Sequence, residues 1–211
     1  MKSELKAFGS DLIRDFHPFR WLSSYRRTSI KYMLVMVIFY HLIGIILVIL
    51  GTAVIQSLVT NYKEPVKPIT VTSVIFAGPI EETLFFGIPL YVTGNNLVVL
   101  GGGILWAMWH LFGPNVQLSS LAYANWLFVL PSIFLSLRTW VSGKGWFAIV
   151  AHSSWNSLFF SLGCASGEIP CKVFYDNNAF SDMVTVMAAI ALILITYFLY
   201  RGKTKKLKYV Y

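Results

Sequence analysis

The sequence predicts an all-α fold, a polytopic membrane bundle with about six transmembrane helices. Of the 211 residues, 56% are hydrophobic and only 12% are charged, whereas soluble domains carry about 25% charged residues. Apolar runs long enough to cross about 30 Å of hydrocarbon as helices recur along the chain. The sequence contains no internal repeat, low-complexity tract or soluble domain, so these helices are expected to make up one membrane domain.

The spans are predicted at residues 32–58, 74–92, 97–113, 121–137, 146–162 and 183–200. With the N-terminus inside, 14 of the 17 Lys and Arg residues fall on the inner side, as positively charged loops usually do. This distribution predicts a multi-pass protein of the cell membrane with both termini in the cytoplasm. The membrane domain, 32–200, would lie between a basic N-terminal segment, 1–31, and a basic tail, 201–211.

The N-terminal segment, 1–31, mixes basic residues with aromatic and apolar ones. This pattern predicts an amphipathic helix on the membrane surface, and a loose basic leader is the alternative. The net charge of +8 is concentrated at the two ends of the chain, where it favours contact with anionic membrane lipid. Nucleic-acid binding is not expected, because it requires a basic face displayed to solvent.

His41 and the two cysteines lie outside the central spans and are not expected to take part in a site. His41 lies in the first span beside Tyr40 and Gly44, and we expect it to pack or hydrogen-bond between helices. Cys164 and Cys171 share one predicted outer loop, where they form either a small disulfide or two free thiols. The fourth and sixth spans carry no charged residue or histidine and are interpreted as structural.

The second span contains Glu81 and Glu82 in an apolar stretch. One acidic residue at the centre of a spanning helix costs roughly 2.5 to 3.5 kcal/mol, so such groups usually have partners. Neighbouring side chains on an α-helix diverge by about 100°, so we expect the two carboxylates not to point at one spot. One glutamate would then do chemistry while the other is held by structure. Pro79 and Pro89 are expected to free backbone carbonyls around this segment.

The third and fifth spans carry further polar groups at helical spacing. Trp106 and His110 are four residues apart, as are His152 and Asn156, so each pair shares one helix face. Each residue alone would be interpreted as a hydrogen-bonding contact between helices, but together they predict a polar site. The predicted boundaries put Glu81 toward the outer half of the membrane and His152 toward the inner half, which predicts a gap in depth between them. The glycines at 101–103 should allow close helix approach.

In this order, Glu81 to Gly87, Trp106 to His110 and His152 to Asn156 resemble the three motifs of the CPBP family, over about residues 74–163. This family contains type II CAAX prenyl proteases and related bacteriocin-processing and immunity proteins. The resemblance implies a helical bundle around a polar intramembrane cavity, and an intramembrane endopeptidase that needs no metal. By this resemblance Glu81 would be the general base and His110 would position the water. His152 and Asn156 would form the oxyanion hole. The supporting groups around them would be Glu82, Trp106 and Phe86.

Phe86 departs from the family pattern, which usually has Arg at this position, four residues after the second glutamate. An Arg there would neutralise Glu82, so without it Glu82 is either protonated or paired with a group that sequence does not identify. The departure keeps open a catalytically silent relative that acts as a binding, immunity or maturation partner. Proton or ion transport and a zinc site built from two imidazoles and a carboxylate are further alternatives. The expected substrate is a peptide or protein, with or without a prenyl group.

Overall fold

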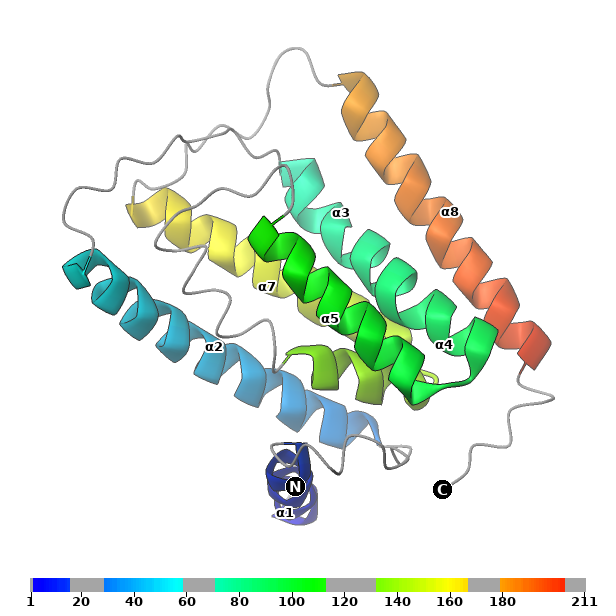
Figure 1. Cartoon of the computed structure of the whole chain (residues 1–211), viewed down its shortest axis with the longest axis horizontal. Helices are drawn as coiled ribbons and strands as arrows, with labels where there is room; N and C mark the ends of the chain where they lie inside the picture. The colour runs from blue at the N-terminus through cyan, green and yellow to red at the C-terminus, as the bar shows by residue number, and fades with distance from the viewer. Residues whose placement is uncertain (1, 16–28, 59–70, 113–131, 167–178, 204–211) are drawn as a thin grey trace.

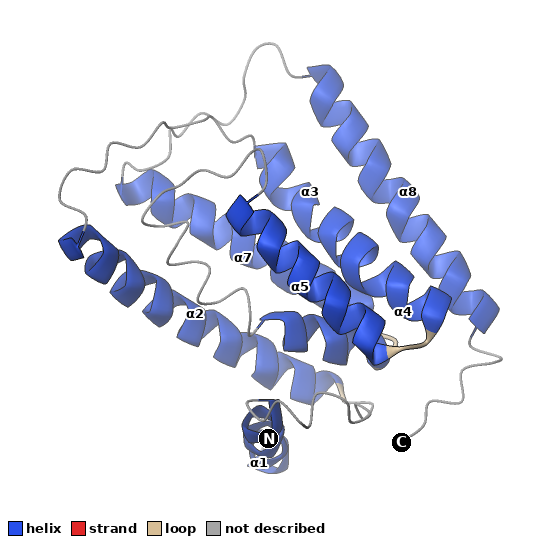
Figure 2. Cartoon of the chain, viewed as in Figure 1, coloured by secondary structure: helices blue, strands red, loops and turns tan. Residues whose placement is uncertain are grey.

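The structure is a computed structural model of the chain and describes residues 2–15, 29–58, 71–112, 132–166 and 179–203. Figure 2 shows that these residues form helices joined by short connections, and no strand occurs among them. The predicted all-α fold class is therefore confirmed. Besides a helical segment over residues 132–141, the elements are α1 (Lys2–Asp15), α2 (Ile30–Leu58), α3 (Val71–Glu81), the π-helix η2 (Glu82–Gly87), α4 (Ile88–Thr93), α5 (Asn96–Phe112), α7 (Gly145–Ser166) and α8 (Ala179–Lys203).

Three of the described helices contain segments long and apolar enough to cross a membrane, Ile30–Gly51, Val74–Thr93 and Ala179–Gly202. These segments coincide with the predicted first, second and sixth spans. The apolar part of α5, Asn96–Trp109, is shorter, and most of the predicted fourth span lies outside the described residues. The total of six spans therefore stays a prediction.

The continuous segment from α3 to α4 runs between α8 on one side and α5 and α7 on the other (Figure 1). α3 packs against α7 and α8, and η2 packs against α5, α7 and α8. α2 lies at the edge, in contact with α1 and α7. This arrangement surrounds the two glutamates, where α3 meets η2, with other helices.

The 132–141 helix joins two clusters of buried apolar side chains. One cluster includes residues of α1, α2 and α7 together with Leu135. The other includes residues of η2, α4 and α5 together with Leu137 and Trp140. A displacement of this short helix would therefore disturb packing on both sides of it.

The central helix changes its hydrogen-bonding pattern directly after Glu81, where the π-helical turn η2 begins. The N–H of Ile88 donates to the carbonyl of Thr83, five residues earlier. Pro79 lies inside α3 and has no N–H to donate to the carbonyl of Ile75, one turn earlier. Ser153 on α7 donates its hydroxyl to that carbonyl at 2.8 Å. The expectation that Pro79 frees a backbone carbonyl is confirmed, and the freed group ties α3 to α7.

Further polar contacts hold α2 and α5 in place. His41 contacts the carbonyl of Val37 through Nδ1 and the hydroxyl of Ser154 on α7 through Nε2, both at 2.9 Å, so its predicted hydrogen-bonding role is confirmed. On α5, a methyl group added at Gly102 would lie 2.5 Å from the carbonyl oxygen of Phe85, whereas Gly101 faces open space. Close approach is therefore confirmed for part of the glycine run.

A helix in the N-terminal segment is confirmed as α1, whose position on a membrane surface stays a prediction. Its Phe8 and Asp11 are buried against the rest of the molecule, while Lys2 and Lys6 are exposed. In Figure 1, α1, the connection between α4 and α5 and the C-terminal end of α8 lie at the lower edge of the view. The orientation of these parts in the membrane stays a prediction.

Cys164, near the end of α7, is disulfide-bonded. The prediction left a disulfide and free thiols open, and for Cys164 the disulfide is confirmed. Cys171 lies outside the described residues.

Candidate active site

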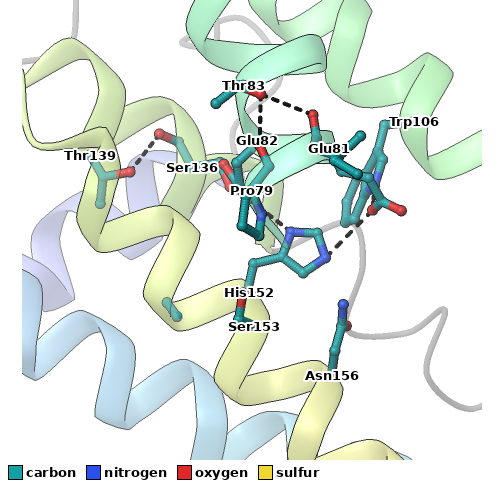
Figure 3. Close-up of polar contacts among 12 residues, drawn as sticks. Pro79, Glu81, Glu82, Thr83, Trp106, Ser136, Thr139, His152, Ser153 and Asn156 are labelled. Carbon is teal, nitrogen blue, oxygen red and sulfur yellow. Dashed lines mark hydrogen bonds and ion pairs between the residues drawn. The ribbon is translucent and has the colours of Figure 1, made fainter. Parts of the chain in front are cut away.

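Side chains from α3, η2, α5, α7 and the 132–141 helix meet where α3 ends, as Figure 3 shows. Glu81 is the last residue of α3 and Glu82 the first of η2. The imidazole of His152 on α7 points into the space between the two carboxylates. The site thus combines side chains from all three predicted motifs with the 132–141 helix, which the predictions did not include in it.

His152 contacts both glutamates, each through a different ring nitrogen. Its Nδ1 lies 3.1 Å from Oε1 of Glu82, and its Nε2 lies 3.5 Å from Oε2 of Glu81. The two carboxylates contact different atoms, as expected for adjacent side chains that diverge on a helix. They nevertheless share one imidazole, because its two nitrogens lie on opposite sides of the ring.

The predicted gap in depth between Glu81 and His152 was wrong, because α3 and α7 pack closely one turn before the glutamates. A methyl group added at Gly78 would collide with the hydroxyl of Ser153 and lie 2.9 Å from the backbone nitrogen of Ser153 and 3.1 Å from the carbonyl oxygen of Ile149. The missing side chain at Gly78 therefore lets the two helix backbones approach. The predicted boundaries assumed straight helices perpendicular to the membrane, and this contact is what they missed.

Glu82 is the buried member of the pair, with 3% of its side chain exposed. Its Oε1 accepts a hydrogen bond from the hydroxyl of Ser136 at 2.7 Å, and its Oε2 accepts one from the indole Nε1 of Trp140 at 2.9 Å. Together with His152, these residues are the partners that sequence did not identify. A buried carboxylate with several donors can stay ionised without an arginine beside it.

Trp140 can reach Glu82 because two glycines leave room for its indole. A methyl group at Gly87 would lie 2.7 Å from two carbon atoms of the ring, and one at Gly145, the first residue of α7, would overlap it. Trp140 also lines a cavity of about 240 Å³ between η2, α4, α7 and α8. Its lining is mostly aromatic and apolar, so the predicted polar cavity is not confirmed by it.

Glu81 is more accessible than its neighbour, with 22% of its side chain exposed. The indole N–H of Trp106 on α5 donates to its Oε2, and the Trp106 ring also packs edge-on against the ring of His152, with centroids 5.4 Å apart. Phe86 is fully buried and contacts the same indole, with centroids 5.9 Å apart. In this chain the position usually held by Arg therefore supports Trp106 instead of neutralising Glu82.

Asn156 lies on the same face of α7 as His152, one turn away (Figure 3). Its amide nitrogen donates to the carbonyl of Val74 on α3 at 3.4 Å, so it adds a second contact between these helices. The backbone of His110 belongs to α5, one turn after Trp106, but its side chain lies outside the described residues.

Ser136 and Trp140 are the site residues that the sequence analysis missed. Ser136 was overlooked because the predicted fourth span has no charged residue or histidine, and Trp140 because it lies beyond the predicted end of that span. They are four residues apart, which is the same spacing that drew attention to the pairs on α5 and α7. The signal available in the sequence was this same spacing on a further helix, in a chain whose two intramembrane glutamates still needed partners.

Among the described residues, no group of three or more His, Cys, Asp or Glu is arranged to hold a metal ion. The observed contacts suit proton transfer. Nδ1 of His152 is hydrogen-bonded to Glu82, whereas Nε2 lies at the longer distance of 3.5 Å from Glu81. Glu81, the accessible carboxylate, is placed to exchange a proton with a reacting group.

Comparison with known proteins addresses the same part of the chain. No curated protein and no solved structure matches the sequence. Residues 63–158 match the family model described as Rce1-like, type II CAAX prenyl endopeptidase. The resemblance predicted from the three motifs is thus confirmed, and the match covers the residues that build this site.

Proposed function

We propose that this protein is an intramembrane endopeptidase of the CAAX-processing type, in which Glu81 activates the attacking water. The observation that carries the proposal is the unequal exposure of two carboxylates that contact one imidazole, 22% for Glu81 and 3% for Glu82. A general base has to reach water and substrate, which Glu81 can do. Glu82 is enclosed by Ser136, Trp140 and His152 and serves to hold the imidazole in place.

The proposed reaction is hydrolysis of a peptide bond. Glu81 takes a proton from water as the oxygen attacks the scissile carbonyl carbon, and a tetrahedral intermediate forms. His152 and Asn156, one turn apart on α7, donate hydrogen bonds to the oxyanion, a contribution that is often the largest in acyl transfer. Glu81 then gives its proton to the leaving nitrogen as the C–N bond breaks. His110 would help to position the water.

The proposed substrate is a peptide or protein segment presented within or next to the membrane lipid, with or without a prenyl group. The matched family model supports the protease class. The peptide panel described next distinguishes prenylated from unprenylated substrates. No metal or other cofactor enters the proposed reaction.

The test is cleavage by purified protein in detergent of a panel of prenylated CAAX peptides and leader peptides. Wild type is compared with Glu81→Gln, which removes the basic oxygen at nearly constant shape, and each is repeated with a chelator. Asp182→Asn, in the first turn of α8, is the matched control. General-base catalysis contributes about 10²- to 10⁴-fold, so we expect a loss of that size in Glu81→Gln only and no effect of chelator.

Two outcomes would contradict the proposal. Full inhibition by chelator that zinc reverses would replace the metal-free mechanism with a metal-dependent one. No cleavage of any peptide by folded wild-type protein would favour the silent binding partner, and Phe86→Arg would then test whether the missing guanidinium explains the silence.

A further inference from the structure

The 132–141 helix has two opposite polar faces. Ser136 and Trp140 are four residues apart and both donate to Glu82. Arg138 lies between them in sequence, about 200° around the helix axis from Ser136. Its side chain therefore leaves the helix on the face turned away from the glutamates.

On that opposite face, Arg138 binds the N-terminal helix α1. Its Nη1 lies 3.4 Å from Oδ2 of Asp11, and its Nη2 donates to the main-chain carbonyl of Asp11 at 3.3 Å. Tyr32 on α2 donates its hydroxyl to the same carboxylate oxygen at 2.6 Å. The side chains of Arg138 and Asp11 are 1% and 8% exposed, and Tyr32 is 1% exposed. One buried network thus joins α1 and α2 to the 132–141 helix, whose opposite face donates hydrogen bonds to Glu82.

From this geometry we infer that Arg138 is a positioning residue for the candidate active site and that Asp11 is the counter-ion that keeps it in place. The inference rests on the proposed function, since it assigns a role in the proposed reaction. A buried charge that loses its partner must move toward water or another polar group. Arg138 sits two residues from both Ser136 and Trp140, so its movement displaces the donors of Glu82 and, through Glu82, the imidazole of His152.

This role differs from that of a helix anchor, which would affect folding without changing the site. It also gives α1 a function beyond contact with lipid. The Arg138 guanidinium was counted among the inner loop charges in the predicted topology, whereas the structure shows it enclosed by protein. The buried pair sets the position of one helix between two neighbours, which is the best-attested use of buried polar groups.

The test uses Asp11→Asn, which removes the charge but keeps an oxygen for the hydroxyl of Tyr32. Glu4→Gln is the matched control, because Glu4 lies on the same helix and accepts a hydrogen bond from Ser29 at the exposed surface. The first measurement is the ¹⁵N–¹H spectrum of the seven tryptophan indoles, with the Trp140 signal assigned by its loss in Trp140→Phe. We expect this signal to shift in Asp11→Asn and to stay in place in Glu4→Gln.

The second measurement is the kinetics of peptide cleavage. A displacement of about 1 Å in a catalytic group can cost roughly 10²-fold in rate, so we expect kcat to fall by up to that factor in Asp11→Asn while KM changes little. Tyr32→Phe removes only one donor to Asp11, and a smaller change in the same direction is expected. It also serves as the second variant if Asp11→Asn does not fold.

The inference would be overturned if Asp11→Asn and Tyr32→Phe both fold, leave the Trp140 signal in place and leave kcat unchanged. A lower unfolding midpoint with no change of signal in the folded protein would assign Asp11 and Arg138 to anchoring alone and would overturn it too. If wild type cleaves no peptide, the proposed function fails, while the Trp140 signal still reports separately on the contact between α1 and the site.

Discussion

At the scale of single residues, the two glutamates differ in how far they are buried, although they are identical side chains at adjacent positions. Both contact His152, but the donors Ser136 and Trp140 enclose Glu82, and Glu81 keeps an accessible surface. The difference arises because Glu81 ends one helical pattern and Glu82 begins another. Identical side chains at adjacent positions therefore have different surroundings, which is the difference that the proposed reaction uses.

Trp140→Phe should destabilise the protein and lower its activity. Phenylalanine keeps the aromatic packing but removes the N–H that Oε2 of Glu82 accepts at 2.9 Å. Leaving a buried acceptor without a donor costs about 1–3 kcal/mol, so we expect a lower midpoint of thermal unfolding in detergent. The control is Trp146→Phe, because that indole is 55% exposed and does not contact Glu82. Equal midpoints for the two variants would show that the bond to Glu82 is unimportant.

The polar residues themselves were largely predictable from sequence. Glu81, Glu82, Trp106 and His152 stand out because a polar group in an apolar helix needs a partner, and the structure brings these four together. Ser136 and Trp140 did not stand out, since no charged residue or histidine marks the predicted fourth span and Trp140 lies beyond its predicted end. Their importance comes from tertiary contact with Glu82, which neither residue reveals alone.

At the scale of elements, glycines set the distances between helices at the site. Gly87 and Gly145 flank the indole of Trp140, and Gly78 lets α7 approach α3. Each of these positions has a close neighbour, whereas Gly101 on α5 has none within 4 Å. The chain therefore offers its own control for substitution by alanine.

Gly145→Ala and Gly87→Ala should each destabilise the protein and weaken the contact between Trp140 and Glu82. The added methyl group overlaps the indole in the first case and lies 2.7 Å from it in the second. Overpacking of this kind costs about 1–3 kcal/mol. Gly101→Ala should instead stabilise its helix by about 0.5–1 kcal/mol. The measurement is the unfolding midpoint, and a shift of the same sign in all three variants would contradict the argument.

Gly78→Ala should separate α3 from α7 and reduce the cleavage rate. Ser153→Ala in the same chain removes the hydroxyl that the methyl group meets, but the backbone atoms of Ser153 and Ile149 remain within about 3 Å. Only partial recovery of activity is therefore expected in the double variant. Complete recovery would mean that the serine hydroxyl, and not the approach of the two backbones, limits this position.

The helices were predicted well where the apolar pattern is long, and less well where it changes. The π-helical turn at Glu82 has no clear pattern in the sequence, although the two prolines indicated an irregularity. A π-helix differs from an α-helix by a single step in hydrogen-bond register, which depends on tertiary contacts such as that of Gly102 with the carbonyl of Phe85. The position of His152 relative to the glutamates could not be derived from sequence without knowledge of this π-helical turn.

At the scale of the whole molecule, the predicted topology remains to be tested by labelling. In a background with both cysteines replaced by serine, single cysteines can be placed at Lys63 and at Lys144. The six-span arrangement predicts that a membrane-impermeant maleimide added to intact cells reacts with Lys63→Cys and not with Lys144→Cys. Reaction at Lys144→Cys but not at Lys63→Cys would invert the orientation, and equal reaction at both positions would change the number of spans between them.

Composition and charge predicted the class of molecule, and the motifs predicted the family, but neither predicted how the N-terminal segment is used. The basic residues of α1 were interpreted as a contact with lipid, and Asp11, a buried acid of this helix, drew no attention. Its partner Arg138 is 127 residues away in the sequence, and no spacing rule connects positions so distant.

The polar stripe of α7 also has a consequence for biosynthesis. This helix carries His152, Ser153, Ser154 and Asn156, whose partners lie on α2, α3 and η2. Alone in lipid these groups would be unsatisfied, so α7 is a poor candidate for independent insertion from the ribosome. It should enter the bilayer only after the earlier helices are present to receive it. Substitutions at the contact between α3 and α7 would then also reduce the amount of membrane-inserted protein, so their cleavage rates have to be compared at equal amounts of folded protein.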